Sequence, residues 1–195
     1  MGSKSAIYRR FLLATLWHAI GRVAEAVFSS WSLTRWDYTL GMLFFNWSQI
    51  KTAKQKGVIM PCDKDGWECD FYHCLASYFV MGFGQNLIEP DGIDWIFPDL
   101  HSLTGSGITK RVATYLRDCL PGMGAKEFES IRVFSLPFDI TGRSLRSGSI
   151  NNCKAMGATH EHISLISGHE MTMFSSLFEY YLVTEYDAVH GMLLF

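Results

Sequence analysis

The stretch Thr141-Gly142-Arg143-Ser144-Leu145-Arg146-Ser147-Gly148 opens the carboxy-terminal part of the chain and places two arginines three residues apart. The pattern predicts a helix over Ser144–Met156, which Gly157 ends because glycine readily adopts the conformation needed at a helix terminus. A second helix is predicted over Thr159–Ile166, with Thr159 as its amino-terminal cap. This part of the chain is therefore expected to be helical, with Arg146 inside the first helix.

Further helices are predicted on the amino-terminal side and at the end of the chain. Apolar residues at helical spacing from Leu13 to Val27 predict one helix that continues to about Ser30. Arg22 and Glu25 are therefore expected on or beside that helix. Other helices are predicted over 70–81, from Ser106 along the apolar stripe Ile108, Val112, Leu116 and Cys119, and over 172–183.

A β-hairpin is predicted between the first two helical regions. The run Leu40–Ile50 is rich in strand-forming residues, and the basic stretch Lys51–Gly57 separates it from the apolar segment Val58–Met60. This order is typical of two antiparallel strands with lysines at their turn. Trp95-Ile96-Phe97-Pro98 is expected to form a short extended segment stopped by the proline. The patterns together predict a mainly α chain of the α+β kind, with roughly seven helices and one small antiparallel sheet.

Composition favours a single domain over residues 1–195, because 48% of the residues are hydrophobic and can fill one sizeable core. The five cysteines include no CxxC pair, which favours a reducing, intracellular compartment. The longest apolar stretches, 11–20 and 71–84, fall short of the roughly 20 residues that a membrane span requires. No membrane contact is expected. His160 and His162 lack the partners of a four-ligand set, so no metal site is expected either.

The formal net charge of −2 does not by itself favour nucleic-acid binding, which depends on Lys and Arg neutralising phosphates. The basic residues are nevertheless unevenly spread. They concentrate at Arg9 and Arg10, at 51–56, and at Arg143, Arg146 and Lys154. Such a distribution permits one basic face on a nearly neutral protein.

Four segments occur in the order typical of the tyrosine recombinases, the phage-integrase-type family. Ala19–Glu25, with an arginine and an acid three residues apart, resembles the first arginine box of that family. Ile50–Lys54 resembles its lysine-bearing β-turn, and Trp95–Pro98 resembles its Phe-Pro segment. Thr141–Gly148, followed by Ile166-Ser167-Gly168-His169 and then a tyrosine, resembles its second box. The resemblance spans Arg22 to Tyr181.

The resemblance implies that the chain cleaves and rejoins DNA through a covalent 3′-phosphotyrosine, with no cofactor and no metal. Tyr180 is the implied nucleophile, and Tyr181 is the alternative. Lys51 is the implied general acid for the leaving 5′ oxygen, with Lys54 as the alternative. Arg22 and Arg146 would bind the non-bridging oxygens, His169 would hydrogen-bond the scissile phosphate, and Glu25 would orient its neighbours from behind.

Two positions depart from the family pattern. Arg143 stands where the second box has a histidine, and a guanidinium that stays protonated can stabilise charge but cannot shuttle a proton. The usual interval after His169 falls on Phe178, so Tyr180 requires extra residues in between. These departures motivate the main alternative, a catalytically degenerate relative that binds DNA or a protein. A type IB-like topoisomerase is a further, less favoured alternative.

The implied fold is the catalytic domain of the DNA breaking–rejoining enzymes, a helical bundle with a small antiparallel sheet. The implied partners are double-stranded DNA and further copies of the chain, assembled as a tetramer, with the apolar tail 189–195 as a docking element. Full-length relatives carry an additional amino-terminal domain that clamps DNA, and the 21 residues before Arg22 leave no space for it. The compartment is bacterial or viral-host cytoplasm, or a nucleus. Integrase, transposase and resolvase activities all fit.

Overall fold

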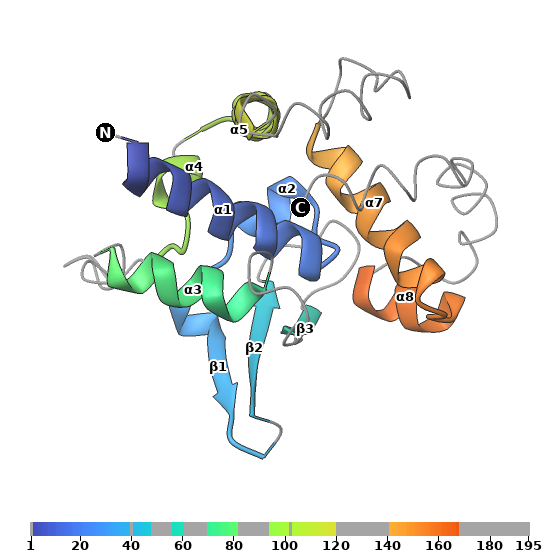
Figure 1. Cartoon of the computed structure of the whole chain (residues 1–195). Helices are drawn as coiled ribbons and strands as arrows, with labels where there is room; N and C mark the ends of the chain where they lie inside the picture. The colour runs from blue at the N-terminus through green and yellow to red at the C-terminus, as the bar shows by residue number, and fades with distance from the viewer. Residues whose placement is uncertain are drawn as a thin grey trace.

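The computed structural model describes residues 2–39, 41–47, 56–60, 70–81, 94–101, 103–119 and 141–167 (Figure 1). This part of the chain is mainly helical and contains a small three-stranded antiparallel sheet. Both features agree with the sequence prediction. The predicted helix over 172–183, the tail 189–195 and residues 51–55 of the predicted hairpin turn lie outside the described residues. Lys56 and Gly57, which were predicted in that turn, belong to the third strand instead.

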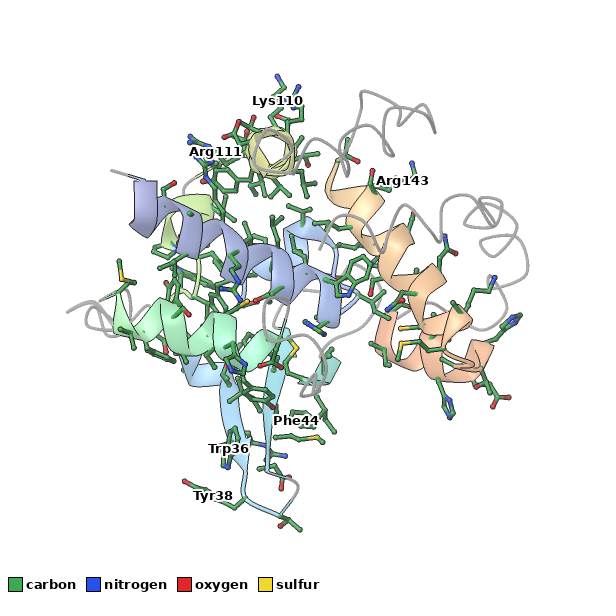
Figure 2. All side chains as sticks on the ribbon, in the orientation of Figure 1. Trp36, Tyr38, Phe44, Lys110, Arg111 and Arg143 are labelled. Atoms are coloured by element: carbon green, nitrogen blue, oxygen red, sulfur yellow. The ribbon has the colours of Figure 1, made fainter. Side chains whose placement is uncertain are left out.

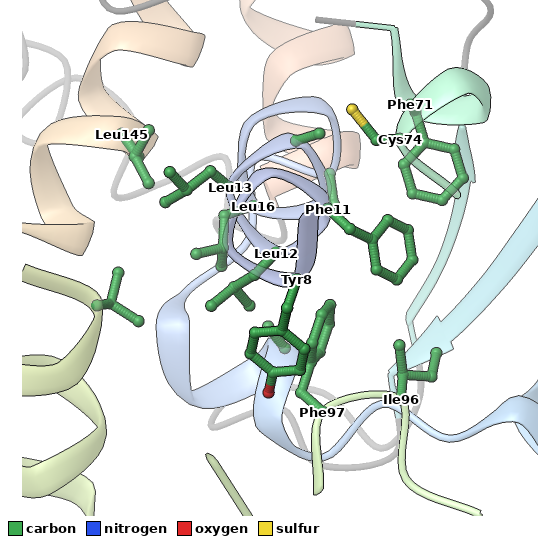
Figure 3. Packing of buried hydrophobic residues seen from close by; sticks show 14 of the residues in the cluster. Tyr8, Phe11, Leu12, Leu13, Leu16, Phe71, Cys74, Ile96, Phe97 and Leu145 are labelled. Atoms are coloured by element: carbon green, nitrogen blue, oxygen red, sulfur yellow. The ribbon is translucent and has the colours of Figure 1, made fainter. Parts of the chain in front are cut away.

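Helix α1, Gly2–His18, is the element around which the others pack. It contacts α3, Phe71–Val80, and α7, Gly142–Ala155 (Figure 1). The Phe11 ring lies between Phe71, Tyr78 and Phe97, with ring-centroid separations of 5.7, 4.7 and 5.4 Å. Edge-on and tilted aromatic contacts at these distances are favourable beyond the area they bury. Figure 3 shows this aromatic core beside α1 and the aliphatic contact of Leu145 with the same helix.

The prediction of one helix reaching Ser30 is wrong, because the chain breaks after His18 and resumes as α2, Val23–Val27. The Gly21 N–H donates to the Leu16 carbonyl at 3.1 Å, which closes α1. Ile20 adopts a φ of 48°, a conformation that β-branched residues rarely take. Its side chain is buried with Ile150 and Ile163, and that apolar contact offsets the local cost.

The sheet has the order β1, Thr34–Asp37, β2, Met42–Trp47, and β3, Lys56–Met60. The predicted antiparallel pairing of the second and third strands is confirmed, with Phe45 opposite Val58. Strand β1 was not predicted. Tyr72 of α3 ties the sheet to the core, because its hydroxyl accepts from the Leu43 N–H and donates to the Met60 carbonyl, both at 2.8 Å.

Helices α3 and α5 lie close to their predicted bounds, and α4 was not foreseen. Asp70 caps α3, as its carboxylate accepts the His73 N–H at 2.9 Å. The chain before Pro98 is extended at Trp95, which bridges Ser30, and this stretch ends at the proline as predicted. Pro98 then opens α4, Pro98–His101, since the first turn of a helix tolerates a missing N–H. Helix α5, Gly105–Cys119, buries Ile108, Val112 and Leu116 of the predicted stripe.

The two carboxy-terminal helices also follow the prediction closely. Helix α7 begins two residues before the predicted start because Thr141 caps it, accepting the Arg143 N–H at 3.2 Å. It ends before Gly157, which has a φ of +85°. Thr159 caps α8, His160–Ser167, by accepting the His162 N–H at 3.3 Å. Of the helices in the described part, none has the length and apolar character needed to traverse a lipid bilayer.

Candidate functional site

Arg22 occupies the amino-terminal cap of α2, at the point where the chain leaves the turn after α1. Its backbone N–H donates to Glu25 Oε2 at 2.7 Å, and its guanidinium donates to Glu25 Oε1 at 3.1 Å. The acid therefore holds both the main chain and the side chain of Arg22. A third of the Arg22 side chain remains exposed, so solvent or a ligand can reach its guanidinium.

Arg146 reaches the same carboxylate from the second turn of α7. One of its guanidinium nitrogens lies 3.8 Å from Glu25 Oε2, and another donates to the Ser167 carbonyl at 2.7 Å. The Arg146 and Glu25 side chains are only 4% and 5% exposed. Ser167 is the last residue of α8, so Arg146 joins the carboxy-terminal end of that helix to α2. A cation at this end of a helix is favoured by the partial negative charge of its carbonyls.

The fold thus places Arg22, Glu25 and Arg146 at one point, although more than a hundred residues separate the two arginines. Two guanidinium groups face one carboxylate. Among the described residues, this corner therefore carries excess positive charge beside a partly exposed arginine. Such an arrangement suits an anion, because fixed donors and charge are in place before the ligand arrives.

Arg143 lies one turn before Arg146, at the amino-terminal end of α7, and its side chain is exposed (Figure 2). The partial positive charge of a helix amino terminus adds to its own charge. Lys154 lies in the last turn of the same helix, and burial lowers its pKa. Arg143, Arg146 and Lys154 therefore do not form one exposed basic patch, because they are spread along three turns and differ in burial.

Arg9, from the amino-terminal basic pair, has an internal partner. Its guanidinium donates to Asp118 at 2.8 Å and lies over the Tyr115 ring, 4.8 Å from the ring centroid. This ion pair joins α1 to α5. Arg9 therefore serves the packing of these helices.

Helix α5 carries basic side chains that the sequence analysis did not single out. Lys110, Arg111 and Arg117 are exposed on α5, and Figure 2 shows Lys110 and Arg111. The predicted apolar stripe could have identified Lys110 and Arg117, since they lie on the opposite face of the helix. They add positive charge near the amino-terminal end of α7, which packs against α5 at Val112.

The remaining predicted site residues, Lys51, Lys54, His169, Tyr180 and Tyr181, lie outside the described residues. His160 and His162, the histidine pair considered for metal binding, are both exposed on α8. In the part of the chain that the structure describes, no three His, Cys, Asp or Glu residues are grouped as metal ligands would be.

Comparisons of the chain with protein-family models, with curated proteins and with solved structures gave no significant match.

Proposed function

We propose that this protein is a site-specific DNA recombinase that cleaves and rejoins strands through a covalent 3′-phosphotyrosine. One observation carries the proposal: Arg22 and Arg146, from distant parts of the chain, converge on the buried carboxylate of Glu25. Burying the Arg146 guanidinium and the Glu25 carboxylate beside the partly exposed Arg22 is costly in a small domain, which favours a functional purpose for the set. Binding a phosphodiester is a purpose that suits this set.

The arginines in this proposal have different duties. Arg22, whose side chain is a third exposed, contacts a non-bridging oxygen of the scissile phosphate directly. Arg146, which is buried, supplies positive charge behind it and keeps Glu25 in place. Arg143 adds a further, exposed cation one turn before Arg146 on α7. A planar guanidinium matches two phosphate oxygens, and its charge persists throughout the reaction.

The covalent step belongs to residues outside the described part of the chain. The Tyr180 oxygen attacks the phosphorus while its proton passes to solvent water, the bond from phosphorus to the 5′ oxygen breaks, and Lys51 gives that 5′ oxygen a proton. His169 hydrogen-bonds the same phosphate. Rejoining reverses these steps, so the energy of the phosphodiester is kept and neither a cofactor nor a metal is needed. Tyr181 and Lys54 remain the alternatives for the nucleophile and the acid.

The duplex on either side of the scissile phosphate requires further positive charge. The exposed Lys110, Arg111 and Arg117 of α5 provide it, and α5 packs against the end of α7 that carries Arg143. Contacts of this kind neutralise phosphates and weaken with salt. The proposal includes a tetramer on paired sites, in which each copy supplies one arginine pair.

A trapping assay tests the proposal. The protein is incubated with a random pool of duplexes that carry bridging phosphorothiolates, which prevent religation, and covalent protein–DNA adducts are recovered and sequenced. We expect adducts that Tyr180→Phe abolishes and that Arg22→Ala reduces by at least about a hundredfold, as loss of a transition-state donor does. Tyr38→Phe, which changes a tyrosine that is 90% exposed at the β1–β2 turn, is the matched control and should react normally.

Arg143 favours one second candidate, a degenerate relative that binds DNA without cutting it. Its position at the start of α7 gives electrostatic attraction but no proton transfer. Salt-sensitive DNA binding without any adduct, also for Arg143→His, would replace the recombinase proposal by this one. Adducts that disappear only with Tyr181→Phe would retain the recombinase and reassign its nucleophile. Relaxation of supercoiled plasmid without strand exchange would identify a topoisomerase.

A further inference from the structure

Gly142, the first residue of α7, lies at a point where three helices meet. A Cβ atom added there would overlap Cγ2 of Val23, the first residue of α2, and would lie 3.5 Å from Cγ1 of Val112 in α5. Gly142 is buried, so the added atom could not turn toward solvent. The amino-terminal end of α7 therefore approaches α2 more closely than any side chain at residue 142 would permit.

The face of α7 that includes Gly142 also carries Arg146 and the contacts that hold this helix against α2 and α1. Residues 142, 146 and 149 follow the helical spacing that places side chains on one face. Gly142 touches α2, Arg146 approaches Glu25 of α2, and the Ser149 hydroxyl donates to the Trp17 carbonyl of α1 at 2.6 Å. The distance between α7 and α2 is thus set at Gly142, one turn before Arg146.

Val23 connects this contact to the other arginine, because it directly follows Arg22 in the sequence. We propose that Gly142 and Val23 form a positioning contact, which sets the separation of the Arg22 and Arg146 guanidinium groups and thereby their fit to a phosphate. The inference rests on the proposed phosphate-binding role of the arginines. Neither Gly142 nor Val23 touches the phosphate.

A side chain at position 142 should therefore displace the Arg146 guanidinium, as well as disturb the packing of the helices. Val23 cannot easily rotate away, because a valine in a helix has one strongly preferred rotamer. Helix α7 must then shift away from α2, and Arg146 shifts with it. Misplacing a reacting group by about 1 Å can cost roughly a hundredfold in rate, so a small shift has a large effect.

The experiment compares four full-length variants with the wild type: Gly142→Ala, Val23→Ala, the double variant, and Gly105→Ala. Gly105 is the matched control, since it is also the first residue of a helix but has no atoms near an added Cβ. The first readout is the arginine Nε–Hε NMR signals of Arg22 and Arg146, recorded without ligand and assigned with Arg→Lys variants. The second readout is titration with inorganic phosphate.

We expect Gly142→Ala to shift both arginine signals and to weaken phosphate binding by about tenfold, the loss of one charge-assisted hydrogen bond. Removing the Val23 methyl groups makes space for the new Cβ, so the double variant should regain the wild-type signals and most of the affinity. Gly105→Ala should match the wild type in both readouts. Rescue of this kind does not follow from a general loss of stability.

Two outcomes would overturn the inference. In one, Gly142→Ala leaves the arginine signals unchanged, which would show that the contact does not set their positions. In the other, the double variant stays as impaired as Gly142→Ala, which would mean that the damage lies elsewhere. If the wild type does not bind phosphate but the signals still shift and recover, the proposed function fails while the positioning contact stands.

Discussion

Glu25 holds together the arginine corner, the group formed by Arg22, Glu25 and Arg146. Its carboxylate accepts the Arg22 N–H at 2.7 Å, pairs with the Arg22 guanidinium and lies 3.8 Å from that of Arg146. A buried cation that loses its counter-ion costs far more than an exposed one, because water cannot replace the lost partner. The same acid thus stabilises the fold and aligns the arginines.

Replacing Glu25 by glutamine should lower the free energy of unfolding by about 2–4 kcal/mol, because the arginines lose their shared negative charge. Urea unfolding followed by circular dichroism measures the loss. Glu161→Gln is the control, since Glu161 is exposed in the first turn of α8, and it should cost about 0.5 kcal/mol or less. Equal losses in the two variants would contradict the role given to Glu25.

Tyr78 gives the core a dependence on alkaline pH. Its hydroxyl donates to the Ile96 carbonyl at 3.0 Å, and burial, assisted by the charge of Asp99, raises its pKa from 10.0 to about 12. Because the folded pKa lies above the unfolded one, the stabilisation by the neutral phenol is complete below about pH 10. It is lost as the pH rises toward 12.

Stability should therefore fall by about 2–3 kcal/mol between pH 10 and 12, at roughly 1.4 kcal/mol for each pKa unit. Denaturant unfolding at fixed pH values measures the fall, and absorbance at the tyrosinate band reports the ionisation. Tyr78→Phe should be less stable than the wild type at neutral pH. Its free energy of unfolding should also change less between pH 10 and 12. Burial raises the pKa of Tyr8 as well, so part of the fall should persist in the variant. An unchanged slope would contradict the assignment to Tyr78.

At the scale of elements, caps decide where the helices begin. Asp70, Thr141 and Thr159 each accept a backbone N–H in the first turn of the helix that they precede. Asp70 does more than this, because its buried carboxylate also contacts His73 Nδ1 at 2.7 Å. The starting point of α3 determines where Tyr72, the second residue of the helix, reaches β2 and β3.

Asp70→Ala should destabilise the protein by about 1–2 kcal/mol, since the first turn of α3 loses its acceptor. For a chain of this size, that loss lowers the melting temperature by about 2–8 °C, which calorimetry can measure. Asp70→Ser keeps a capping oxygen and should recover much of the loss. A serine variant as unstable as the alanine variant would show that capping is not the cause.

At the scale of the whole molecule, α1 connects the aromatic core to the arginine corner. One face of α1 packs on α3 through Phe11, while the Trp17 carbonyl and Leu13 lie toward α7 and its Leu145 (Figure 3). The arginines are therefore held by the same helix that organises the core. Damage to the core should reach the site, and the described elements should unfold together.

Phe11→Ala should cost about 3–5 kcal/mol, because a fully buried ring is replaced by a cavity. Far-ultraviolet circular dichroism and tryptophan fluorescence should report one common transition at lower denaturant, as expected for a single cooperative domain. Tyr38→Ala, which truncates an exposed aromatic side chain, should leave the midpoint nearly unchanged. Two separated transitions would contradict the single-domain prediction.

The sequence alone determined the elements whose signals are local. Asp70 and Thr159 marked the starts of α3 and α8, Gly157 marked the end of α7, and the stripe from Ile108 to Leu116 identified the buried face of α5. Caps and helical periodicity involve residues within a few positions of one another, so they can be read without knowing the fold. The hairpin of β2 and β3 was recognisable for the same reason.

Only the tertiary structure decided how these elements meet. The break between α1 and α2 depends on Ile20, whose unusual backbone is held by Ile150 and Ile163 from the other end of the chain. The burial of Arg146 and the absence of space at Gly142 likewise depend on partners in distant segments. Contacts between segments that are far apart in the sequence produce no periodic sequence pattern, because each depends on how whole helices pack.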